Sequence, residues 1–288
     1  MEEKTIIYIM SDVRSGSTLL ENILSNSPEI VSVGELIHLH AYLNKGDVGK
    51  VFEWKCSCGK DFNTCEFWSK IFSSLKEHGI IDVKKTSVFK SKDLNFRKRL
   101  ESIHLPENEQ IINHVDKIYE TIFDISNKSF IVDSSKNEIQ LAALIKYSRY
   151  NIKVIYIKRD IRAVVLSKLK WQIKLGLKQT NIFKLLLATK IKNNIQNTTF
   201  GKVVKKNDRL KLNYGEIAND VPGTLNKIFK FTGIEPYTSP KFMEMHNNHS
   251  VGGTPNRERR EISYDNSWKA EIATKPFFRM VGKFIDFI

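Results

Sequence analysis

One stretch near the start of the chain, residues 6–20, constrains the fold more than any other. Its sequence is IIYIMSDVRSGSTLL, in which an apolar run leads into a short polar loop and apolar residues then recur at helical spacing. This order predicts a strand, a tight loop and a helix. The first backbone N–H groups of a helix are unsatisfied and carry the positive end of its dipole. The loop is therefore a candidate oxyanion site, with a phosphate as the expected ligand.

The composition of this loop fits that interpretation. Gly16 permits a close approach of the backbone to an anion, while Arg14, Ser15, Ser17 and Thr18 add side-chain donors. An ordinary turn between a strand and a helix, capped by Ser or Thr, has a similar composition. The loop alone leaves anion binding and simple capping as open alternatives.

Two later segments repeat the order of strand, polar loop and helix. Residues 129–133 (SFIVD) are an apolar run followed by SSK, and residues 152–157 (IKVIYI) are another, followed by KRD. Helical patterns come after both. Three such units predict an α/β fold with a central parallel sheet flanked by helices. In such a sheet the ligand lies outside the carboxyl ends of the strands.

The rest of the chain is expected to extend and cover this sheet. Residues 36–128 show no clean alternation of strand and helix patterns. We interpret them as a mostly helical insertion that forms part of the substrate cleft, within a single domain of residues 1–288. The other expected elements are strands at 30–33 and 210–214, a basic helix within 180–207, a helix at 221–232, a loop at 237–265 and an apolar helix at 277–288. This last helix is expected to dock on the core, with a membrane-surface helix as the alternative.

The charge balance indicates anionic partners. The chain has 46 Lys and Arg residues against 32 Asp and Glu, a formal net charge of +14. This excess suits nucleotides, sulfated or acidic polymers, nucleic acid or membrane surfaces, and charge alone does not choose among them. The N-terminal residues lack a signal-peptide pattern and no apolar run is long enough to span a bilayer. The sequence therefore favours a cytoplasmic location.

All three cysteines, Cys56, Cys58 and Cys65, fall within the segment CSCGKDFNTC. A zinc site needs a fourth ligand, and the spacing C-x-C-x6-C is not a standard zinc pattern. The pattern favours reduced thiols in a packed loop, with a redox-formed pair as the alternative. No metal requirement is expected.

A second anion-binding element is indicated by Arg159 and Ser167. Arg159 follows a strand and Ser167 lies about two turns into the next helix, so both can reach one side of a phosphate. Together, RSGST and RDIRAVVLS resemble motifs of the sulfotransferase family that uses 3′-phosphoadenosine 5′-phosphosulfate (PAPS). Further segments that resemble this family are LNYGEIANDVPGTLNKIFKFTGIEP, NHSVGGTPNR and CSCGKDFNTCEFW.

The resemblance implies a P-loop-NTPase-like sulfotransferase fold and PAPS as the co-substrate. It assigns the 3′-phosphate to Arg159 and Ser167, the adenine side of the nucleotide to Tyr214, and a further phosphate contact to Arg257. The 5′-phosphosulfate is assigned to the first loop, at Arg14, Ser15, Gly16, Ser17 and Thr18.

Sulfuryl transfer to a hydroxyl or amine requires a proton acceptor beside the nucleophile and cationic donors around the sulfuryl group and the leaving phosphate. Glu35 follows the second expected strand, and the resemblance to tyrosylprotein and several bacterial sulfotransferases makes it the general base. The resemblance also makes Lys136 the residue that stabilises charge on the bridging oxygen, and Arg14 completes the catalytic set. Glu35 could instead neutralise Arg14 or cap a helix, and Asp133 is expected to orient Lys136 or Ser17. The alternative bases are His38, His40 and His249.

Two rival functions are weighed against this interpretation. A P-loop kinase or NTPase has the same arrangement of strand, loop and helix, and Asp133 resembles a Walker B acid. The first loop lacks the G-x-x-x-x-G-K-[ST] lysine that such enzymes use. A nucleic-acid-binding module fits the net charge, but no recognised RNA or DNA motif is present, so no nucleic acid partner is expected. The sequence leaves the acceptor open among a glycan, a peptide, a lipid and a small molecule.

Overall fold

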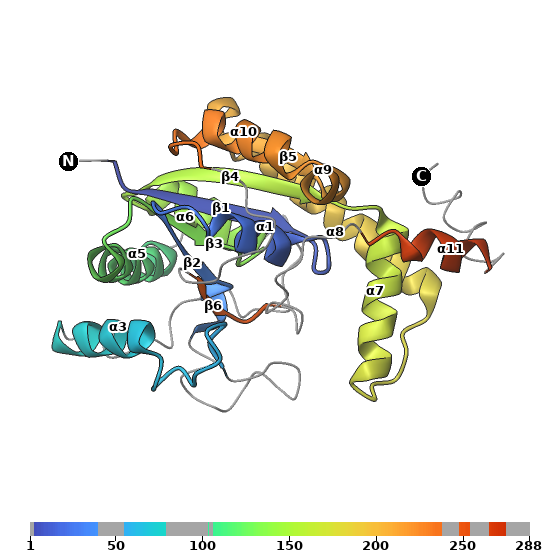
Figure 1. Cartoon of the computed structure of the whole chain (residues 1–288), viewed down its shortest axis with the longest axis horizontal. Helices are drawn as coiled ribbons and strands as arrows, with labels where there is room; N and C mark the ends of the chain where they lie inside the picture. The colour runs from blue at the N-terminus through green and yellow to red at the C-terminus, as the bar shows by residue number, and fades with distance from the viewer. Residues whose placement is uncertain are drawn as a thin grey trace.

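A parallel sheet with β1 (Thr5–Ser11) at its centre organises the structure, a computed structural model that describes residues 3–39, 55–78, 103, 106–237, 248–253 and 265–274. In these ranges six strands lie in the order β5-β4-β1-β3-β2-β6 (Figure 1). The other five strands are β2 (Ile30–Gly34), β3 (Phe130–Asp133), β4 (Asn151–Lys158), β5 (Arg209–Asn213) and β6 (Asn248–Val251). The α/β fold with a central parallel sheet, expected from the sequence, is confirmed.

The apolar sequence of β1 follows from its central position. Ile6, Tyr8 and Met10 belong to the core on one face of the sheet, and Ile7 and Ile9 belong to the core on the other. Successive side chains of a strand point to opposite faces, so a strand that is covered on both sides has no position left for an exposed polar residue. Every residue of β1 is buried.

Helices cover both faces of the sheet. One face packs against α5 (Pro106–Ser126), α6 (Glu138–Tyr147) and α8 (Ile182–Lys202), with α3 (Glu66–Glu77) packed outside α5. The other face packs against α1 (Ser17–Leu24), α9 (Tyr214–Asn219) and α10 (Val221–Thr232). Figure 1 shows α9 and α10 on the opposite side of the sheet from α5. A smaller apolar cluster joins α7 (Ile161–Lys174), α8 and α11 (Ser267–Ala273).

The expected helical insertion at 36–128 is described in part. Its described residues contain the 3-10 turn Leu36–His38 and the helices α3 and α5. Ile112, Ile118 and Ile122 of α5 are fully buried in the same core as β1, so this helix belongs to the layer that covers the sheet. No helix within the described ranges combines the length and hydrophobicity needed to cross a lipid bilayer.

The strand β6 corrects one sequence expectation, because the sequence predicts loop throughout 237–265. Residues 248–251 instead pair in parallel with β2, with Ser32 opposite Asn248 and Gly34 opposite Val251. The sequence NHSV is short and mostly polar, so it carries no strand pattern of its own. The sheet edge supplies the pairing, for example through the backbone N–H of Glu35, which donates to the carbonyl oxygen of Val251 at 2.7 Å. The expected helix at 277–288 lies outside the described residues.

Gly34 is the position where β2 and β6 approach most closely. Its φ is +71°, and a Cβ there would lie 2.5 Å from the carbonyl oxygen of Val251 and 2.7 Å from its nitrogen. We expect Gly34→Ala to lower the free energy of unfolding by about 2–4 kcal/mol, because the backbone of β6 would have to move in addition to the strain at positive φ. Urea unfolding of the purified protein measures this loss.

Gly176→Ala is the matched control for this prediction. Gly176 also has a positive φ, +64°, but no atom lies within 4 Å of the position that its Cβ would take. The control is expected to lose only about 1 kcal/mol, the cost of the backbone conformation alone. Equal losses in the two variants would contradict the close packing of β6 against Gly34.

Candidate functional site

The loops that follow β1, β2, β3 and β4 meet at the carboxyl edge of the sheet. Adjacent strands lie about 4.8 Å apart, so the loop after β1 has the β3 loop as its neighbour on one side and the β4 loop on the other. The β2 loop is one strand further, beyond β3. Most of the residues that the sequence singled out therefore gather along one edge of the molecule, as expected for a doubly wound sheet.

Two residues of the first loop have a left-handed backbone conformation. Arg14 has a φ of +68° and Gly16, the N-cap of α1, a φ of +97°. A Cβ on Gly16 would lie 2.5 Å from Cδ2 of Tyr214. Gly16 therefore has a role that the sequence did not predict, because its lack of a side chain lets the ring of Tyr214 pack on the loop. Ser15 and Ser17 are buried and Thr18 is half-buried.

Asp12 anchors this loop to the helices beside it. Its buried carboxylate accepts a hydrogen bond from Nζ of Lys168 at 2.6 Å, and Nζ of Lys192 lies 3.5 Å from its other oxygen. The Val13 N–H also donates to Asp12 at 2.8 Å. Sequence reasoning missed this anchor, since nothing in the sequence joins Asp12 to two lysines on α7 and α8.

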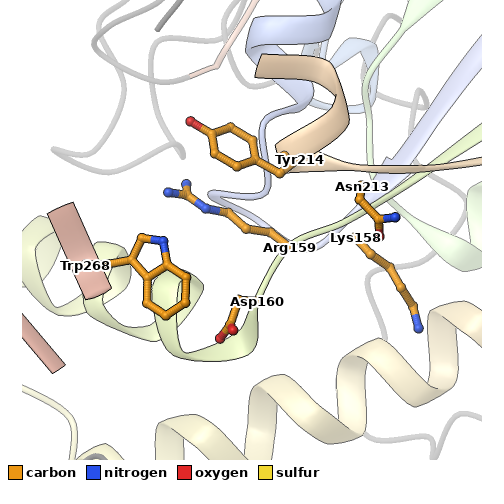
Figure 2. Close-up of a pocket in the computed structure, with 7 residues that line it drawn as sticks. Lys158, Arg159, Asp160, Asn213, Tyr214 and Trp268 are labelled. Atoms are coloured by element: carbon orange, nitrogen blue, oxygen red, sulfur yellow. The ribbon is translucent and has the colours of Figure 1, made fainter. Parts of the chain in front are cut away.

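Arg14, Arg159, Ser167 and Tyr214 come together from four different elements, and we call them the arginine cluster. Nε of Arg14 donates to the hydroxyl of Ser167 at 2.8 Å, and Nη1 of Arg159 donates to the carbonyl oxygen of Arg14 at 3.0 Å. The guanidinium of Arg159 lies 4.1 Å from the centre of the Tyr214 ring, a cation–π contact. Figure 2 shows Arg159 extending beneath this ring, with Trp268 across the pocket.

The arginine cluster is electrostatically unbalanced. Burial, together with the positive charge of Arg159, lowers the pKa of Arg14, and within the described residues no carboxylate forms an ion pair with Arg14. Arg159 pairs with the carboxylate of Asp265 at 3.3 Å. Its Nε is buried and has no hydrogen-bond partner among the residues that the structure describes. Because an unmatched buried donor is costly, the cluster is suited to an anion that accepts hydrogen bonds.

A pocket of about 280 Å³ opens beside this cluster (Figure 2). Its walls come from the ends of β4 and β5, from the starts of the helices that follow them and from α11. The lining residues are Lys158, Arg159, Asp160, Asn213, Tyr214, Gly215 and Trp268. The rings of Tyr214 and Trp268 can stack on a planar base, and the cationic side chains in the lining can pair with a phosphate that the base carries.

Glu35 and Lys136 form an ion pair on the other side of the first loop. Nζ of Lys136 donates to Oε1 of Glu35 at 2.6 Å, and both side chains are largely buried. Nε2 of His38 lies 3.6 Å from Oε2 of the same carboxylate, and burial lowers the pKa of His38. The alternative role of Glu35, to neutralise Arg14, is wrong in this structure because its cationic partner is Lys136. Lys136 has a φ of +59°, a strained conformation for a residue with a side chain.

Asp133 holds the loop after β3 in place. It accepts hydrogen bonds from the hydroxyl of Ser135 at 2.5 Å, the N–H of Ser135 at 2.8 Å and the hydroxyl of Tyr119 at 2.6 Å. The Ser135 hydroxyl oxygen in turn accepts from the N–H of Ile37 at 3.0 Å, which ties the β3 loop to the β2 loop. The expectation that Asp133 orients Lys136 or Ser17 is therefore wrong. It acts on Ser135, beside Lys136.

Sequence reasoning also missed Glu21, a fully buried carboxylate on α1. The hydroxyls of Ser32 and Ser134 donate to it at 2.6 and 2.8 Å, and that of Ser250 donates as well. These serines belong to β2, the β3 loop and β6, so one carboxylate links three segments of the site. Burial raises the pKa of Glu21. The sequence carried one signal for this buried role: Glu21 follows Leu20, on the face of α1 that packs against the sheet.

Three of the predicted residues are not part of this arrangement. Arg257 and His40 lie outside the described residues. His249 lies on β6, where Nδ1 of its ring contacts the sulfur atoms of Cys56 and Cys65 at 3.7 and 3.5 Å. The remaining predicted residues form two groups on either side of the loop after β1.

Comparison with known proteins agrees with this architecture. Residues 7–239 match the model of the sulfotransferase family. The fold is similar to the sulfotransferase domain from the curacin biosynthetic pathway, with a TM-score of 0.56, 13% identity and 99% of each chain covered. It is also similar to the sulfotransferase domain from the Synechococcus PCC 7002 olefin synthase, with a TM-score of 0.53, 15% identity and coverage of 99% and 95%. No curated protein sequence matches the chain.

Asp133 gives a prediction on pH dependence. Burial raises its pKa to about 6, whereas the unfolded chain loses this proton near pH 4. Between about pH 4 and pH 6 the folded state therefore binds more protons than the unfolded state, and ionisation of Asp133 destabilises the fold as the pH rises. Asp133→Asn removes this titration. We expect the stability of the wild type relative to Asp133→Asn to fall by roughly 3 kcal/mol from pH 4 to pH 7.

Chemical denaturation of both proteins at the two pH values checks this prediction. Taking the difference between the proteins cancels the groups that titrate identically in each. A difference that stays constant with pH would mean that Asp133 ionises in the folded protein at its ordinary pKa.

Proposed function

The chain belongs to the sulfotransferase family, and we propose that it transfers the sulfuryl group of PAPS to a hydroxyl or amine of an acceptor. The proposal rests above all on the arginine cluster. Two guanidinium groups, a serine hydroxyl and a tyrosine ring converge there, and Nε of Arg159 is buried with no hydrogen-bond partner in the described part of the chain. A nucleotide with phosphates at two positions supplies the acceptors that these donors lack.

The two phosphate positions are divided between two loops. In the proposal, the first loop binds the 5′-phosphosulfate through Arg14, Ser15, Gly16, Ser17 and Thr18, at the N-terminus of α1. Arg159 and Ser167 bind the 3′-phosphate, and Tyr214 contacts the adenine side. The hydrogen bond between Arg14 and Ser167, 2.8 Å long, supports this assignment because it places the 5′-phosphosulfate loop next to the 3′-phosphate residues, as one nucleotide requires. Arg257 is proposed as a further phosphate contact.

The acceptor is proposed to bind on the opposite side of the first loop. In the strand order, the β4 loop with Arg159 lies on one side of β1, and the β3 and β2 loops with Lys136 and Glu35 lie on the other. A nucleotide on the β4 side can therefore present its sulfuryl group toward the ion pair of Glu35 and Lys136. Residues 36–128, as a helical insertion within a single domain of residues 1–288, are proposed to contribute to the acceptor cleft.

The ion pair supplies the proton chemistry that transfer requires. PAPS supplies an activated sulfuryl group; its S–O bond to phosphate breaks as the bond to the acceptor oxygen or nitrogen forms. Glu35 takes the acceptor proton on a carboxylate oxygen. Lys136, 2.6 Å from Glu35, orients this carboxylate and stabilises the negative charge that develops on the leaving phosphate. Arg14 donates to the sulfuryl oxygens. No step is assigned to a metal ion.

The rival kinase or NTPase function has less support. The residue that would act as a Walker B acid, Asp133, is fully buried and its oxygens are occupied by Ser135 and Tyr119. Arg14 stands in the loop where a Walker lysine would be required. A direct comparison of ligands tests the choice between the two functions.

We expect adenosine 3′,5′-bisphosphate, the desulfonated product, to stabilise the protein far more than AMP or ATP with magnesium. At a hundredfold excess over its dissociation constant, a ligand specific for the native state adds roughly 2.7 kcal/mol, equivalent to several degrees in the melting temperature. Differential scanning fluorimetry measures this shift. An equal response to ATP with magnesium would overturn the sulfotransferase proposal in favour of the kinase.

Arg159→Ala is expected to weaken the binding of the bisphosphate roughly 10–100-fold, because it removes charge-assisted hydrogen bonds to a phosphate. Isothermal titration calorimetry measures the affinity. Arg149→Ala is the matched control, since Arg149 precedes β4 at the opposite edge of the sheet and pairs with Glu120 at 2.7 Å. A similar loss in both variants would contradict the assignment of Arg159 to the 3′-phosphate.

Glu35→Gln is expected to bind the bisphosphate normally and to lose transfer by about 10²–10⁴-fold, the usual contribution of a general base. Transfer of labelled sulfate from PAPS into a native cell extract, followed by identification of the product, measures this loss and reveals the acceptor.

His38→Gln tests the alternative base. The side chain of His38 lies 3.6 Å from Glu35, so the two variants perturb the same region and differ in the group that is removed. If Glu35 is the base, His38→Gln retains most of the activity. Full activity in Glu35→Gln together with loss in His38→Gln would transfer the role of base to His38.

A further inference from the structure

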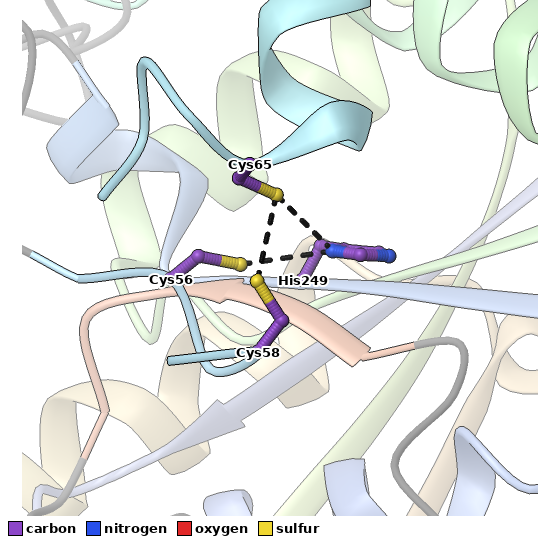
Figure 3. A group of neighbouring side chains, drawn as sticks. All are labelled: Cys56, Cys58, Cys65 and His249. Atoms are coloured by element: carbon purple, nitrogen blue, oxygen red, sulfur yellow. Dashed lines mark hydrogen bonds between the residues drawn. The ribbon is translucent and has the colours of Figure 1, made fainter. Parts of the chain in front are cut away.

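Cys56, Cys58, Cys65 and His249 form a second constellation of reactive side chains, which we call the cysteine–histidine cluster. The sequence lacked a fourth ligand for its three cysteines, and the fold supplies one from β6, 184 residues beyond Cys65. All four potential ligand atoms lie within 4.8 Å of one another. Figure 3 shows the three thiols converging on the imidazole ring of His249. Every cysteine of the chain belongs to this cluster.

The distances within the cluster match those of a tetrahedral metal site. A tetrahedron with Zn–S bonds of about 2.3 Å and a Zn–N bond of about 2.0 Å has edges of about 3.8 Å between sulfurs and about 3.5 Å from sulfur to nitrogen. In the structure, the sulfurs of Cys58 and Cys65 are 3.6 Å apart. Nδ1 of His249 lies 3.7 Å from the sulfur of Cys56 and 3.5 Å from that of Cys65. These three distances agree with the edges of a tetrahedral zinc site, and all four atoms lie within 4.8 Å of one another.

The cluster lies at the start of a helix and is open on one side. Cys65 is the N-cap of α3, where the positive end of the helix dipole stabilises negative charge. Cys56 and Cys65 are buried whereas Cys58 is exposed, so the site is enclosed on most sides and open to an entering ion on one.

The ring of His249 is held in place by its neighbours. It stacks on Phe67 with ring centres 4.4 Å apart and an angle of 13° between the planes. Nε1 of Trp68 donates to the backbone carbonyl of His249 at 2.7 Å. Both aromatic residues lie in the first turn of α3, directly after Cys65. The imidazole therefore faces the thiols in a fixed orientation, which a metal site requires.

We propose that Cys56, Cys58, Cys65 and His249 bind one zinc ion, which joins the segment 56–65 to β6. Three thiolates and one imidazole are a donor set that zinc prefers in structural sites. A disulfide is the competing arrangement, but it would use two of the sulfurs and leave the third thiol and the imidazole without a function. The site fills its four positions with protein ligands, so its role is structural and not catalytic.

The location of the site gives it a consequence for the neighbouring loops. β6 is a short edge strand whose pairing with β2 shifts register between Ser32 and Gly34. Its Val251 carbonyl accepts the hydrogen bond from the N–H of Glu35 at 2.7 Å. The hydroxyl of Ser57, between two of the ligands, donates to the Asn248 carbonyl at 2.7 Å. A zinc ion bound to His249 would fasten this weak strand, and with it the backbone of Glu35.

Metal analysis of the full-length protein tests the proposal without any activity assay, so failure of the sulfotransferase proposal would leave this test unaffected. The protein is purified from zinc-supplied cells under reducing conditions without chelator. We expect one zinc ion per chain by plasma mass spectrometry. Replacement by Co²⁺ is expected to give the intense visible absorption of a tetrahedral site with thiolate ligands. Zinc removal is expected to accelerate amide hydrogen exchange in residues 248–251.

Single variants identify the ligands. Cys65→Ser and His249→Gln are expected to lose most of the bound zinc. His78→Gln is the matched control, because His78 is an exposed histidine at the end of α3 whose ring contacts the carbonyl oxygen of Ser74. It should retain one zinc ion per chain. If Cys65→Ser does not fold, the zinc content and the cobalt spectrum of the wild-type protein still decide the question.

Three results would overturn the zinc site. The first is wild-type protein that contains only trace zinc, binds no Co²⁺ and has three titratable thiols. The second is a disulfide between two of the cysteines in freshly isolated protein, detected by mass spectrometry after alkylation. The third is zinc that remains bound in both Cys65→Ser and His249→Gln.

Discussion

The close approach of two positive groups, the guanidiniums of Arg14 and Arg159, is the interaction on which the site depends. Like charges in a partly buried position repel and lose hydration, and the lowered pKa of Arg14 expresses both costs. The fold offsets part of this cost. Arg159 donates to the backbone of Arg14 and lies over the Tyr214 ring, and Arg14 donates to Ser167. None of these partners carries a full negative charge, and Asp265, which lies 3.3 Å from Arg159, offsets only one of the two guanidinium charges. The cluster therefore keeps an excess of positive charge that an anion can balance.

A separate set of buried carboxylates organises the other half of the site. Glu21 accepts hydrogen bonds from serines of three segments, and Asp133 fixes the β3 loop through Ser135 and Tyr119. Burial raises the pKa of both groups, because a low-dielectric environment disfavours their charged forms. The hydrogen bonds that satisfy these oxygens also determine where Lys136 and Glu35 lie. The ion pair between those two residues is therefore positioned by a network of buried hydrogen bonds in addition to apolar packing.

Parallel pairing connects the two halves. Each strand of a parallel sheet delivers its loop to the same edge, so the cationic side and the acidic side of the site are separated by the width of the strands between them. The edge strand β6 belongs to this arrangement although its sequence has no strand pattern. Its position is fixed by Gly34, which has no side chain to block it, and by the Cys and Trp side chains that surround His249. Contacts remote in sequence thus define the backbone next to Glu35.

The sequence by itself determined the elements whose pattern is local. The apolar run of β1, the loop that ends at Gly16 and the repeated order of strand, loop and helix were sufficient to predict a parallel α/β sheet, and the motifs at Arg14, Arg159 and Ser167 predicted the family. Only the tertiary structure decided the partners: Lys136 for Glu35, Ser135 and Tyr119 for Asp133, and His249 for the three cysteines. Periodicity records which face of an element is buried, whereas the pairing of polar groups depends on distances between segments that lie far apart in the chain.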